Sequence, residues 1–409
     1  MRIWQTLRVA VRALLLNKLR SFLTVLGVII GVGAVIAMVA IGEGAKAMVE
    51  QTFASMGSNL LIVTPGSSNR GGAFGGFGSL PSLTWDDLEA IRTELSSARS
   101  AAAVMRTGAQ VSSEDENWST QVTGSSPEYF EIRSWNVASG SAMSQSDVEG
   151  GNKVALLGQT VAEKLFGSSS DPVGQVIRIR NIPFEVIGVL EKKGQSPMGQ
   201  DYDDVVIVPQ TTFMARIQGG LQKYVAGVFF VSAESAEAAP RTVSDVSNLL
   251  RDRHKLAAGA DDDFGVRNMS ELAAAEQQGT STLTTLLAAI AAVSLVVGGI
   301  GIMNIMLVSV TERTREIGLR MAIGATPRNV LLQFLVEALT LASAGGLLGV
   351  ALGLWLANKL ASEFGWPMLV RADIVAMSLG FSALVGVVFG SYPAWKASRL
   401  EPIEALRYE

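Results

Sequence analysis

Residues 277–311 read QQGTSTLTTLLAAIAAVSLVVGGIGIMNIMLVSVT and contain no charged side chain. One crossing of a bilayer needs about 20 mostly apolar residues, so the helix expected here is long enough to extend beyond the membrane. Three other stretches are long and apolar enough to cross, at 21–42, 338–358 and 374–395. The sequence therefore predicts four transmembrane α-helices, at 21–42, 277–310, 330–358 and 374–395.

The composition agrees with a membrane protein and excludes several other classes. The chain has 409 residues, of which 48% are hydrophobic and 17% charged, whereas soluble proteins carry about 25% charged residues. A net charge of −4 argues against a nucleic-acid partner, which would require a basic face. There is no cysteine and one histidine, His254, so we expect no disulfide, no thiol catalysis, no zinc–cysteine site and no multi-histidine metal cluster. A calcium site at the acidic cluster 261–263 is possible, but the spacing of an EF-hand is missing, so we predict no metal-binding residues.

The first apolar stretch could be mistaken for a signal peptide, because AKA at 45–47 resembles a cleavage site. The apolar region of a signal peptide runs for about 7–15 residues, and 21–42 is longer. We therefore expect this stretch to be retained as a membrane span.

Lysine and arginine near the spans predict the orientation of the chain, since these residues favour the cytoplasmic side. Residues 1–20 are predicted to form an amphipathic cytoplasmic helix, and they contain five basic and no acidic residues. The loop at 311–329 and the tail at 396–409 are also basic, whereas the loop between the last two spans has only Lys359 and Arg371. We expect both termini in the cytoplasm, the large segment 43–276 outside it, and the protein in the cytoplasmic (inner) membrane.

The external segment shows short strand patterns interleaved with amphipathic helices, which predicts an α+β domain. Thr84 is a candidate helix cap followed by acidic residues in the first turn. A β-hairpin is expected within 175–194, with its turn at 181–183. A helix is expected at 241–256, with Val243, Val246, Leu249 and Leu250 on one face. The glycine- and serine-rich segment 67–82 is expected to be a flexible loop.

Glycines recur at a spacing of four in three of the predicted spans. Small residues at this spacing let helix backbones approach closely where lipid offers no hydrophobic drive, although glycine is also simply common in such helices. We expect these residues to pack helix against helix, within the chain or across a dimer: Gly27, Gly31, Gly345, Gly349, Gly353, Gly386 and Gly390.

No enzyme site is visible in the sequence. The chain has no Gly-Lys dipeptide, so a phosphate-binding loop of the Walker A type is excluded. His254 is expected to be solvated on a polar helix face, and Asp261–Asp263 to form a solvated turn. Glu337 and Asn304 fall inside predicted spans and are expected to bond a neighbouring helix or reach the interface. Neither has a second carboxylate or histidine within the spans to relay protons, so proton-coupled transport is disfavoured.

The segment TERTREIGLRMAIGATPRN at 311–329 predicts a sharp cytoplasmic corner. Glu316 and Arg320 are four residues apart and can pair on a helix face. Gly324 can end this helix, and Thr326 can cap a new one whose first residue is Pro327. Anchoring by positive charge explains the arginines but not the glutamates or the apolar residues beside them, so we expect the corner to dock another protein.

Four stretches in the right order resemble the MacB/FtsX-type permease family, the type VII class of ABC transporters. They are NKLRSFLTVLGVIIGVGAVIAMVAIGEGAK at 17–46, NLLIVTPG at 59–66, TERTREIGLRMAIGAT at 311–326 and YPAWKASRLEPIEALRYE at 392–409. The resemblance implies that the external domain has a porter-like lobe and an inserted lobe, which we place at about 120–224. It also implies an ATPase-coupling role for residues of the corner: Glu312, Arg313, Thr314, Arg315, Glu316, Ile317, Gly318, Arg320, Met321, Gly324 and Ala325.

The same resemblance implies a dimer of permeases, each bound to a cytoplasmic ABC ATPase. Because Met1 directly precedes the predicted amphipathic helix, the ATPase, with its ATP and Mg²⁺, is expected on a separate chain. The permease would then act by mechanotransmission, passing motion of the ATPase to the external domain. A MacB-like exporter of peptides, toxins or antibiotics, working with a periplasmic adaptor and a TolC-like outer-membrane channel, is the first interpretation.

Two other functions are consistent with the same resemblance. One is the release of lipoproteins, as in LolC and LolE relatives, although 17–46 and 59–66 look less like those proteins. The other is a regulator that transmits ATPase motion to a cell-wall hydrolase, as FtsX does, although FtsX has a smaller external domain. An adaptor, a lipoprotein or a hydrolase bound to the external domain would distinguish the three.

Overall fold

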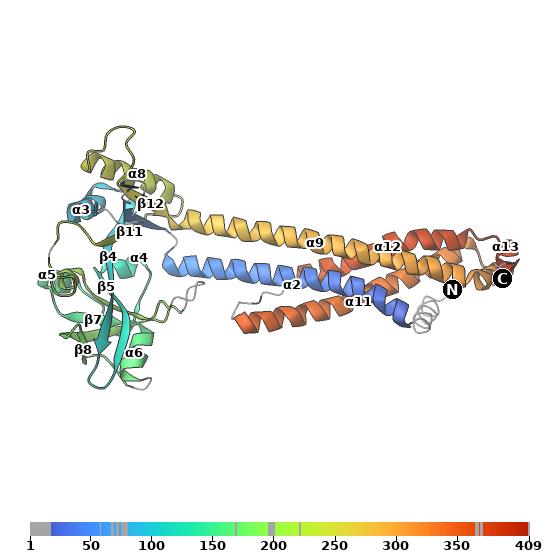
Figure 1. Ribbon diagram of the computed structural model, residues 1–409, viewed down its shortest axis with the longest axis horizontal. Coiled ribbons are helices and arrows are strands. Elements are labelled where there is room, and N and C mark those ends of the chain that lie inside the picture. Colours follow the sequence, from blue (N-terminus) through green and yellow to red (C-terminus); the bar gives the residue numbers. More distant parts are fainter. Residues whose placement is uncertain are drawn as a thin grey trace. The chain divides into compact units, whose positions relative to one another are not determined.

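The computed structural model divides the chain into two compact units, residues 1–48 with 277–409 and residues 49–276 (Figure 1). It describes residues 18–57, 59–66, 69–70, 73–74, 81–167, 170–194, 201–220, 222–364, 368 and 371–407. Most of the predicted amphipathic helix at 1–20 therefore lies outside the described residues. The two units are considered separately below.

The first unit is helical. Within the described chain, four helices are long and apolar enough to cross a membrane: α2 (Lys18–Met56), α9 (Met269–Glu312), α11 (Pro327–Phe364) and α12 (Ala372–Ser398). The 44 residues of α9 correspond to about 66 Å of helix at 1.5 Å per residue, about twice the thickness of a bilayer core. The expectation of a second helix longer than one crossing is confirmed. Two shorter helices complete the unit, α10 (Thr314–Ala322) and α13 (Pro402–Arg407).

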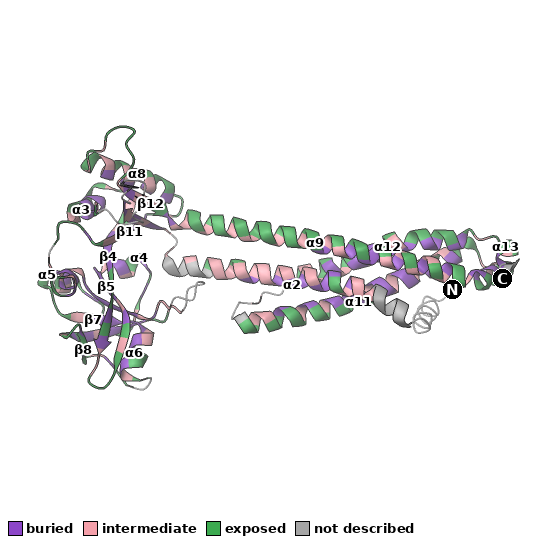
Figure 2. Ribbon diagram, in the orientation of Figure 1, coloured by how far each residue is buried: buried purple, intermediate pink, exposed green. Residues whose placement is uncertain are grey.

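Close helix contacts in this unit occur at glycines. A Cβ atom added to Gly27 would lie 3.2 Å from the Cα atom of Gly298, which places α2 directly against α9. A Cβ atom on Gly386 would lie 2.5 Å from that of Ala342, where α12 meets α11. The other glycines singled out in the sequence also face side chains of neighbouring helices: Gly31, Gly345, Gly349, Gly353 and Gly390. Figure 2 shows how buried and exposed positions alternate along these helices.

In the second unit, ten strands of the described chain form one mixed sheet in the order β12-β1-β11-β4-β5-β10-β7-β9-β6, with β8 paired to β4 and β9. The pairs β5–β10 and β7–β9 are parallel and the others antiparallel. The strands are β1 (Leu60–Pro65), β4 (Ala98–Ser112), β5 (Asn117–Ser125), β6 (Val137–Gly140), β7 (Val154–Leu157), β8 (Val176–Ile179), β9 (Ile182–Leu190), β10 (Val205–Pro209), β11 (Gly227–Ala233) and β12 (Phe264–Asn268).

Helices cover both faces of this sheet, because the strands bury apolar side chains on alternate sides. Leu61 and Phe229 belong to one buried cluster and Leu60 and Phe230 to the other. The helices are α3 (Trp85–Glu94), α4 (Glu128–Ile132), α5 (Gln145–Gly150), α6 (Gln159–Phe166), α7 (Gln210–Thr212), a π-helix η1 (Phe213–Gln218) and α8 (Ala239–Arg253).

The local predictions for this domain are largely confirmed. Thr84 caps α3 in a reciprocal box with Asp87, whose carboxylate accepts from the Thr84 N–H at 2.9 Å. The predicted hairpin is β8–β9, but its turn is Arg180–Asn181, so the turn predicted at 181–183 was wrong. Both turn residues have positive φ, +47° and +67°, as a two-residue type I′ turn requires, and Ile182 already belongs to the strand.

The segment 67–82, predicted as a flexible loop, contains a two-stranded ribbon of β2 (Asn69–Arg70) and β3 (Ala73–Phe74). Much of the rest of this segment lies outside the described residues.

Candidate functional site: the corner between α9 and α11

The chain turns sharply between α9 and α11, and α10 forms the corner. The helix α10 ends near Gly324, whose φ of +103° is a conformation that glycine adopts at low cost. The Ala325 N–H donates to the Arg320 carbonyl at 3.0 Å, which closes the end of the helix. The Thr326 hydroxyl then accepts from the Asn329 N–H at 3.4 Å, and α11 begins at Pro327. The predicted stop and restart of the helix within a few residues is confirmed.

One face of α10 is buried. Thr314, Ile317 and Gly318 are the buried residues of this helix. A Cβ atom on Gly318 would lie 2.6 Å from that of Ala405, so α10 and α13 are in direct contact at this point. Met321 packs at the edge of the same apolar cluster. The corner is therefore held by packing against the C-terminal helix.

Ion pairs fix the corner to α11. The Arg313 guanidinium lies 3.4 Å from the Glu337 carboxylate, whose side chain is only 4% exposed. Arg320 pairs with Glu316 and donates to the Gln333 side chain at 3.2 Å. The expectation that Glu337 bonds a neighbouring helical segment is confirmed. Asn304, in contrast, is exposed and makes no side-chain hydrogen bond within the described part of the chain.

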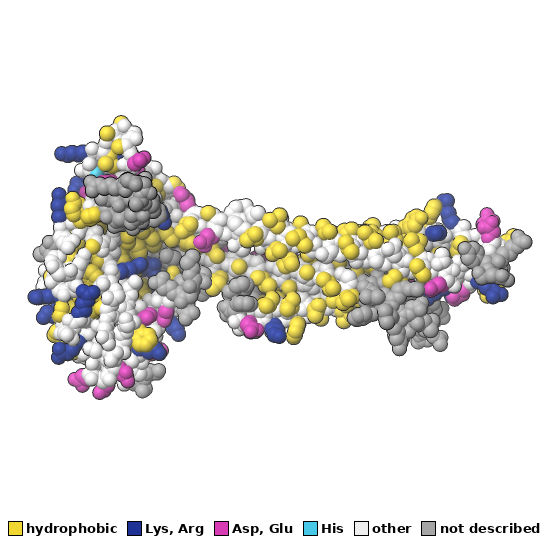
Figure 3. All heavy atoms as spheres, in the orientation of Figure 1, with side chains coloured by type: hydrophobic (Ala, Val, Ile, Leu, Met, Phe, Trp, Pro, Cys, Tyr) yellow, Lys and Arg dark blue, Asp and Glu magenta, His cyan; other side chains and the backbone are white. Residues whose placement is uncertain are grey.

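The opposite face of α10 is exposed and carries both charged and apolar side chains. Leu319 is 55% exposed and Ile323 is 80% exposed. Arg315 lies four residues before Leu319 and is also exposed, so the three side chains share one helical face. In Figure 3, charged side chains gather at the end of the helical unit where α13 lies, beyond a largely hydrophobic surface.

The family of the chain follows from both of its units. Residues 21–249 match the family model for a MacB-like periplasmic core domain, and residues 288–402 match that for an FtsX-like permease C-terminal region. The chain belongs to the MacB-like permease family.

Several curated relatives are named "Macrolide export ATP-binding/permease protein MacB". The relative from Bdellovibrio bacteriovorus is 44% identical over 394 residues, which cover 96% of this chain and 60% of the relative. The relative from Rhodospirillum rubrum is 44% identical over 407 residues, covering 99% of this chain and 60% of the relative. This MacB-like permease therefore spans about 60% of the length of these relatives.

Two solved structures are similar to the MacB-like permease at low identity. The periplasmic region of MacB from Actinobacillus actinomycetemcomitans is 17% identical with a TM-score of 0.44, covering 55% of this chain and 95% of that structure. The extracellular domain of the noncanonic ABC-type transporter YknZ from Gram-positive bacteria is 20% identical with a TM-score of 0.41, covering 51% of this chain and all of that structure.

The structure brings all the residues predicted for coupling into this corner, but it assigns them different positions. Thr314, Ile317 and Gly318 face inward, whereas Glu312, Arg315 and Glu316 are exposed. The predicted set omitted Leu319 and Ile323, the most exposed apolar side chains of the corner. Leu319 and Ile323 follow Arg315 by four and eight residues, and this helical spacing was the sequence signal that could have included them.

His254 of the MacB-like permease is not solvated, so that prediction was wrong. Its ring is 9% exposed, with Nδ1 at 2.7 Å from Asp263 and Nε2 at 3.2 Å from Asp87. Arg253 also pairs with Asp87 at 2.8 Å. Burial alone would lower the pKa of His254, but the hydrogen bonds and charges of Asp263 and Asp87 outweigh burial and raise it.

The prediction for Asp261–Asp263 was wrong in part, since Asp263 binds His254 and Asp262 pairs with Arg251. These contacts join α3, α8 and the start of β12. No group of three His, Cys, Asp or Glu residues in the described ranges is placed to hold a metal ion.

Proposed function

We propose that this MacB-like permease is the membrane subunit of an ATP-driven ABC exporter, and that an ATPase docks on the exposed face of α10. The observation that supports the proposal is the two-sided character of this helix. Its inner face packs against α13, while Arg315, Leu319 and Ile323 are exposed beyond it. Exposed apolar side chains beside charged ones are typical of a protein interface.

Mechanotransmission is the mode of action that these helices support. From Met269, which directly follows β12, the chain continues as one helix, α9, to Glu312 beside the corner. This helix contains no proline, the commonest cause of a sharp kink. A push on α10 would therefore be passed along α9 toward the external domain. Charged residues are scarce in the spans, which favours such movement over a polar path for substrate.

The remaining parts of the assembly are proposed from the family. The ATPase, with its ATP and Mg²⁺, would be a partner on the cytoplasmic side, and a second copy of the permease would complete a dimer. Both termini would lie in the cytoplasm and the external domain in the periplasm of a double-membrane cell. There the domain would engage a periplasmic adaptor and a TolC-like outer-membrane channel to export peptides, toxins or antibiotics.

Co-purification of the ATPase from host membranes tests the docking role. Arg315→Glu reverses an exposed charge and removes none of the contacts described for α10, whereas changing Arg320 would also break its bonds to Glu316 and Gln333. Arg178→Glu, at an exposed position on β8, is the matched control. We expect Arg315→Glu to insert normally but to lose most of the bound ATPase, with the control unchanged. Equal ATPase recovery with both variants would contradict the docking role.

A further inference from the structure

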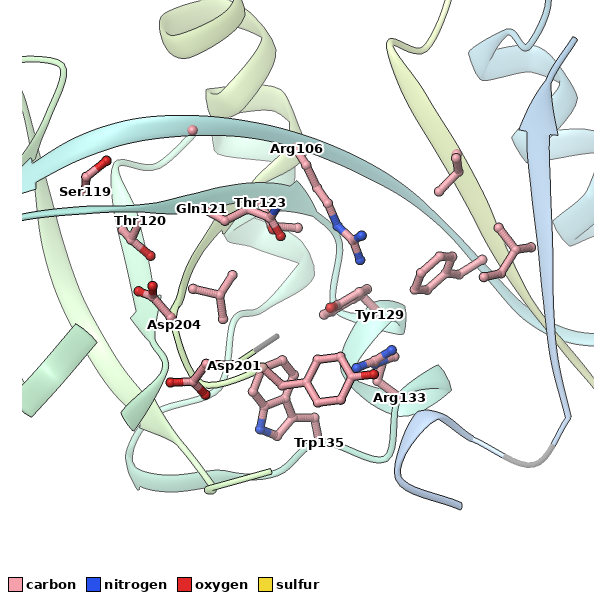
Figure 4. Close-up of a pocket in the computed structure, with 16 residues that line it drawn as sticks. Arg106, Ser119, Thr120, Gln121, Thr123, Tyr129, Arg133, Trp135, Asp201 and Asp204 are labelled. Atoms are coloured by element: carbon pink, nitrogen blue, oxygen red, sulfur yellow. The ribbon is translucent and has the colours of Figure 1, made fainter. Parts of the chain in front are cut away.

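The external domain contains a polar pocket of about 580 Å³ that is separate from the corner. Strands β1, β4, β5, β10 and β11 supply part of its wall, and the segments around α4 and just before β10 supply the rest (Figure 4). This volume is in the range of small-molecule sites. Every residue of its lining belongs to the second unit of the chain.

One end of the pocket carries two arginines without a carboxylate partner in the described part of the chain. Arg133 is 3% exposed, and its Nε atom is buried without a hydrogen-bond partner. Arg106 lies on β4, and its guanidinium stands over the Phe230 ring, 5.9 Å from the centroid. A buried guanidinium is costly unless an anion or acceptors compensate it. This end of the pocket is therefore prepared for an anionic group.

Positive charge extends beyond the two arginines. The Lys193 ammonium donates to the Arg133 carbonyl and lies 5.3 Å from the centroid of the Trp135 ring. Burial first and the nearby Arg133 charge second lower the pKa of Lys193 to about 8, against the opposing effect of Asp203. The Lys193 and Arg133 cations therefore lie close enough to repel each other, and Asp203 partly offsets this repulsion at Lys193.

The other end of the pocket is acidic. In Figure 4, Asp204 lies beside Thr120 and Asp201 lies between Asp204 and Trp135, both away from Arg106 and Arg133. The Asp201 carboxylate accepts from the Thr160 hydroxyl at 2.7 Å and from the Asp203 N–H at 2.9 Å. Asp204 accepts from the Trp118 indole N–H at 2.9 Å through one oxygen, which leaves the other for a ligand.

Aromatic rings form the wall between the two ends, and an unused hydroxyl lies at the acidic end. Tyr129 stacks on Phe230 with ring centroids 6.0 Å apart, and Trp135 is fixed by its N–H bond to the Glu191 carbonyl at 2.7 Å. The Thr120 hydroxyl is buried without a hydrogen-bond partner. Such a wall suits an apolar or aromatic group with a nearby acceptor.

We propose that this pocket binds a short peptide with free ends, its carboxylate on Arg106 and Arg133, its amino group toward Asp204 and its apolar side chain on the aromatic wall. Arginine pairs with carboxylates through two parallel hydrogen bonds. A ligand that reached both ends of the pocket and was negatively charged at each end would place a negative group beside the Asp204 carboxylate, which would repel it. The proposal goes beyond the export function and does not depend on the ATPase.

Titration calorimetry on the full chain in detergent, without ATPase, tests the proposal. The probe is the tripeptide alanyl-phenylalanyl-alanine, used with free ends, as its C-terminal amide and as its N-acetyl form. The amide cannot accept charge-assisted hydrogen bonds from the two arginines, so we expect it to bind at least about ten-fold more weakly. The acetylated form should also bind more weakly, by a smaller factor.

Arg106→Gln is the decisive variant, because Arg106 is exposed and its replacement leaves the core intact. We expect it to weaken binding of the free tripeptide about ten-fold and to abolish the difference between acid and amide. Arg178→Gln, an exposed arginine outside the pocket lining, is the matched control and should bind as the unaltered chain does. No saturable binding, equal binding of acid and amide, or equal loss in both variants would overturn the proposal. Equal binding of the acetylated form would overturn the assignment of the amino group to Asp204.

Discussion

Replacing Arg313 by Met should destabilise the corner far more than replacing its partner, Glu337. The Glu337 side chain is only 4% exposed, and one of its carboxylate oxygens has no hydrogen-bond partner. The Arg313 side chain is 22% exposed. Without Arg313 a carboxylate is left buried and unpaired. Without Glu337 the guanidinium can turn toward water.

The geometry gives the expected size of this asymmetry. Two unit charges 3.4 Å apart attract by about 5 kcal/mol at an effective dielectric constant of about 20. The loss of water around Glu337 cancels most of this gain, so the net contribution of the pair is small. Removing one partner of a buried pair typically costs about 3–5 kcal/mol, while replacing both by apolar residues is often neutral. We therefore expect a loss of about 3–4 kcal/mol for Arg313→Met, less than about 1 kcal/mol for Glu337→Met, and near-recovery in the double variant.

The assay is the free energy of unfolding of the full chain in mixed micelles, measured for all four members of the cycle. Recovery of about 3 kcal/mol in the double variant would show that Arg313 acts through Glu337. Additive effects of the two replacements, or equal losses from both single variants, would refute the reasoning.

Two further predictions concern the external domain and the contact of α10 with α13. The pKa of His254 is higher in the folded protein than in the unfolded chain. The protonated histidine therefore contributes its full stabilisation below the unfolded pKa of about 6.5, and this contribution is lost as the pH rises through the folded pKa. The full chain should therefore melt at a higher temperature at pH 6 than at pH 8, and His254→Gln should shrink that difference; an unchanged difference would exclude the histidine as its source. Gly318→Val places methyl groups where a Cβ atom would already lie 2.6 Å from that of Ala405. Overpacking costs about 1–3 kcal/mol, so this variant should expose α13 to proteolysis, whereas Ala322→Val, at an exposed position of the same helix, should not.

Much of the architecture could be predicted from local patterns. Long uncharged runs indicated the membrane helices, because lipid leaves few alternatives for an apolar stretch of this length. The Thr84 cap and the turn at Gly324 were also predictable, since each depends on residues within four positions. The inner and outer faces of α10 followed from helical periodicity once its ends were known.

Features that depend on distant contacts could not be predicted in this way. His254 forms a hydrogen bond with Asp87, which lies 167 positions earlier in the chain. The sequence around His254 therefore contained no signal for this partner. The pocket could not be predicted for the same reason, because Arg106 and Asp204 belong to distant segments that only the sheet brings together. The turn at Arg180–Asn181 was missed because Pro183 is a common turn residue, yet here it lies in a strand paired with Arg178.

Site-specific crosslinking at Ile323 tests the central claim most directly. The chain has no cysteine of its own, so Ile323→Cys provides a single reactive thiol at an 80% exposed position directly after α10. Val176→Cys, 53% exposed on β8, provides the matched control in the external domain. The account predicts that a short thiol-reactive crosslinker joins position 323, but not position 176, to the ATPase in host membranes. An ATPase that binds the permease and supports transport while position 323 remains uncrosslinked and fully reactive would contradict it.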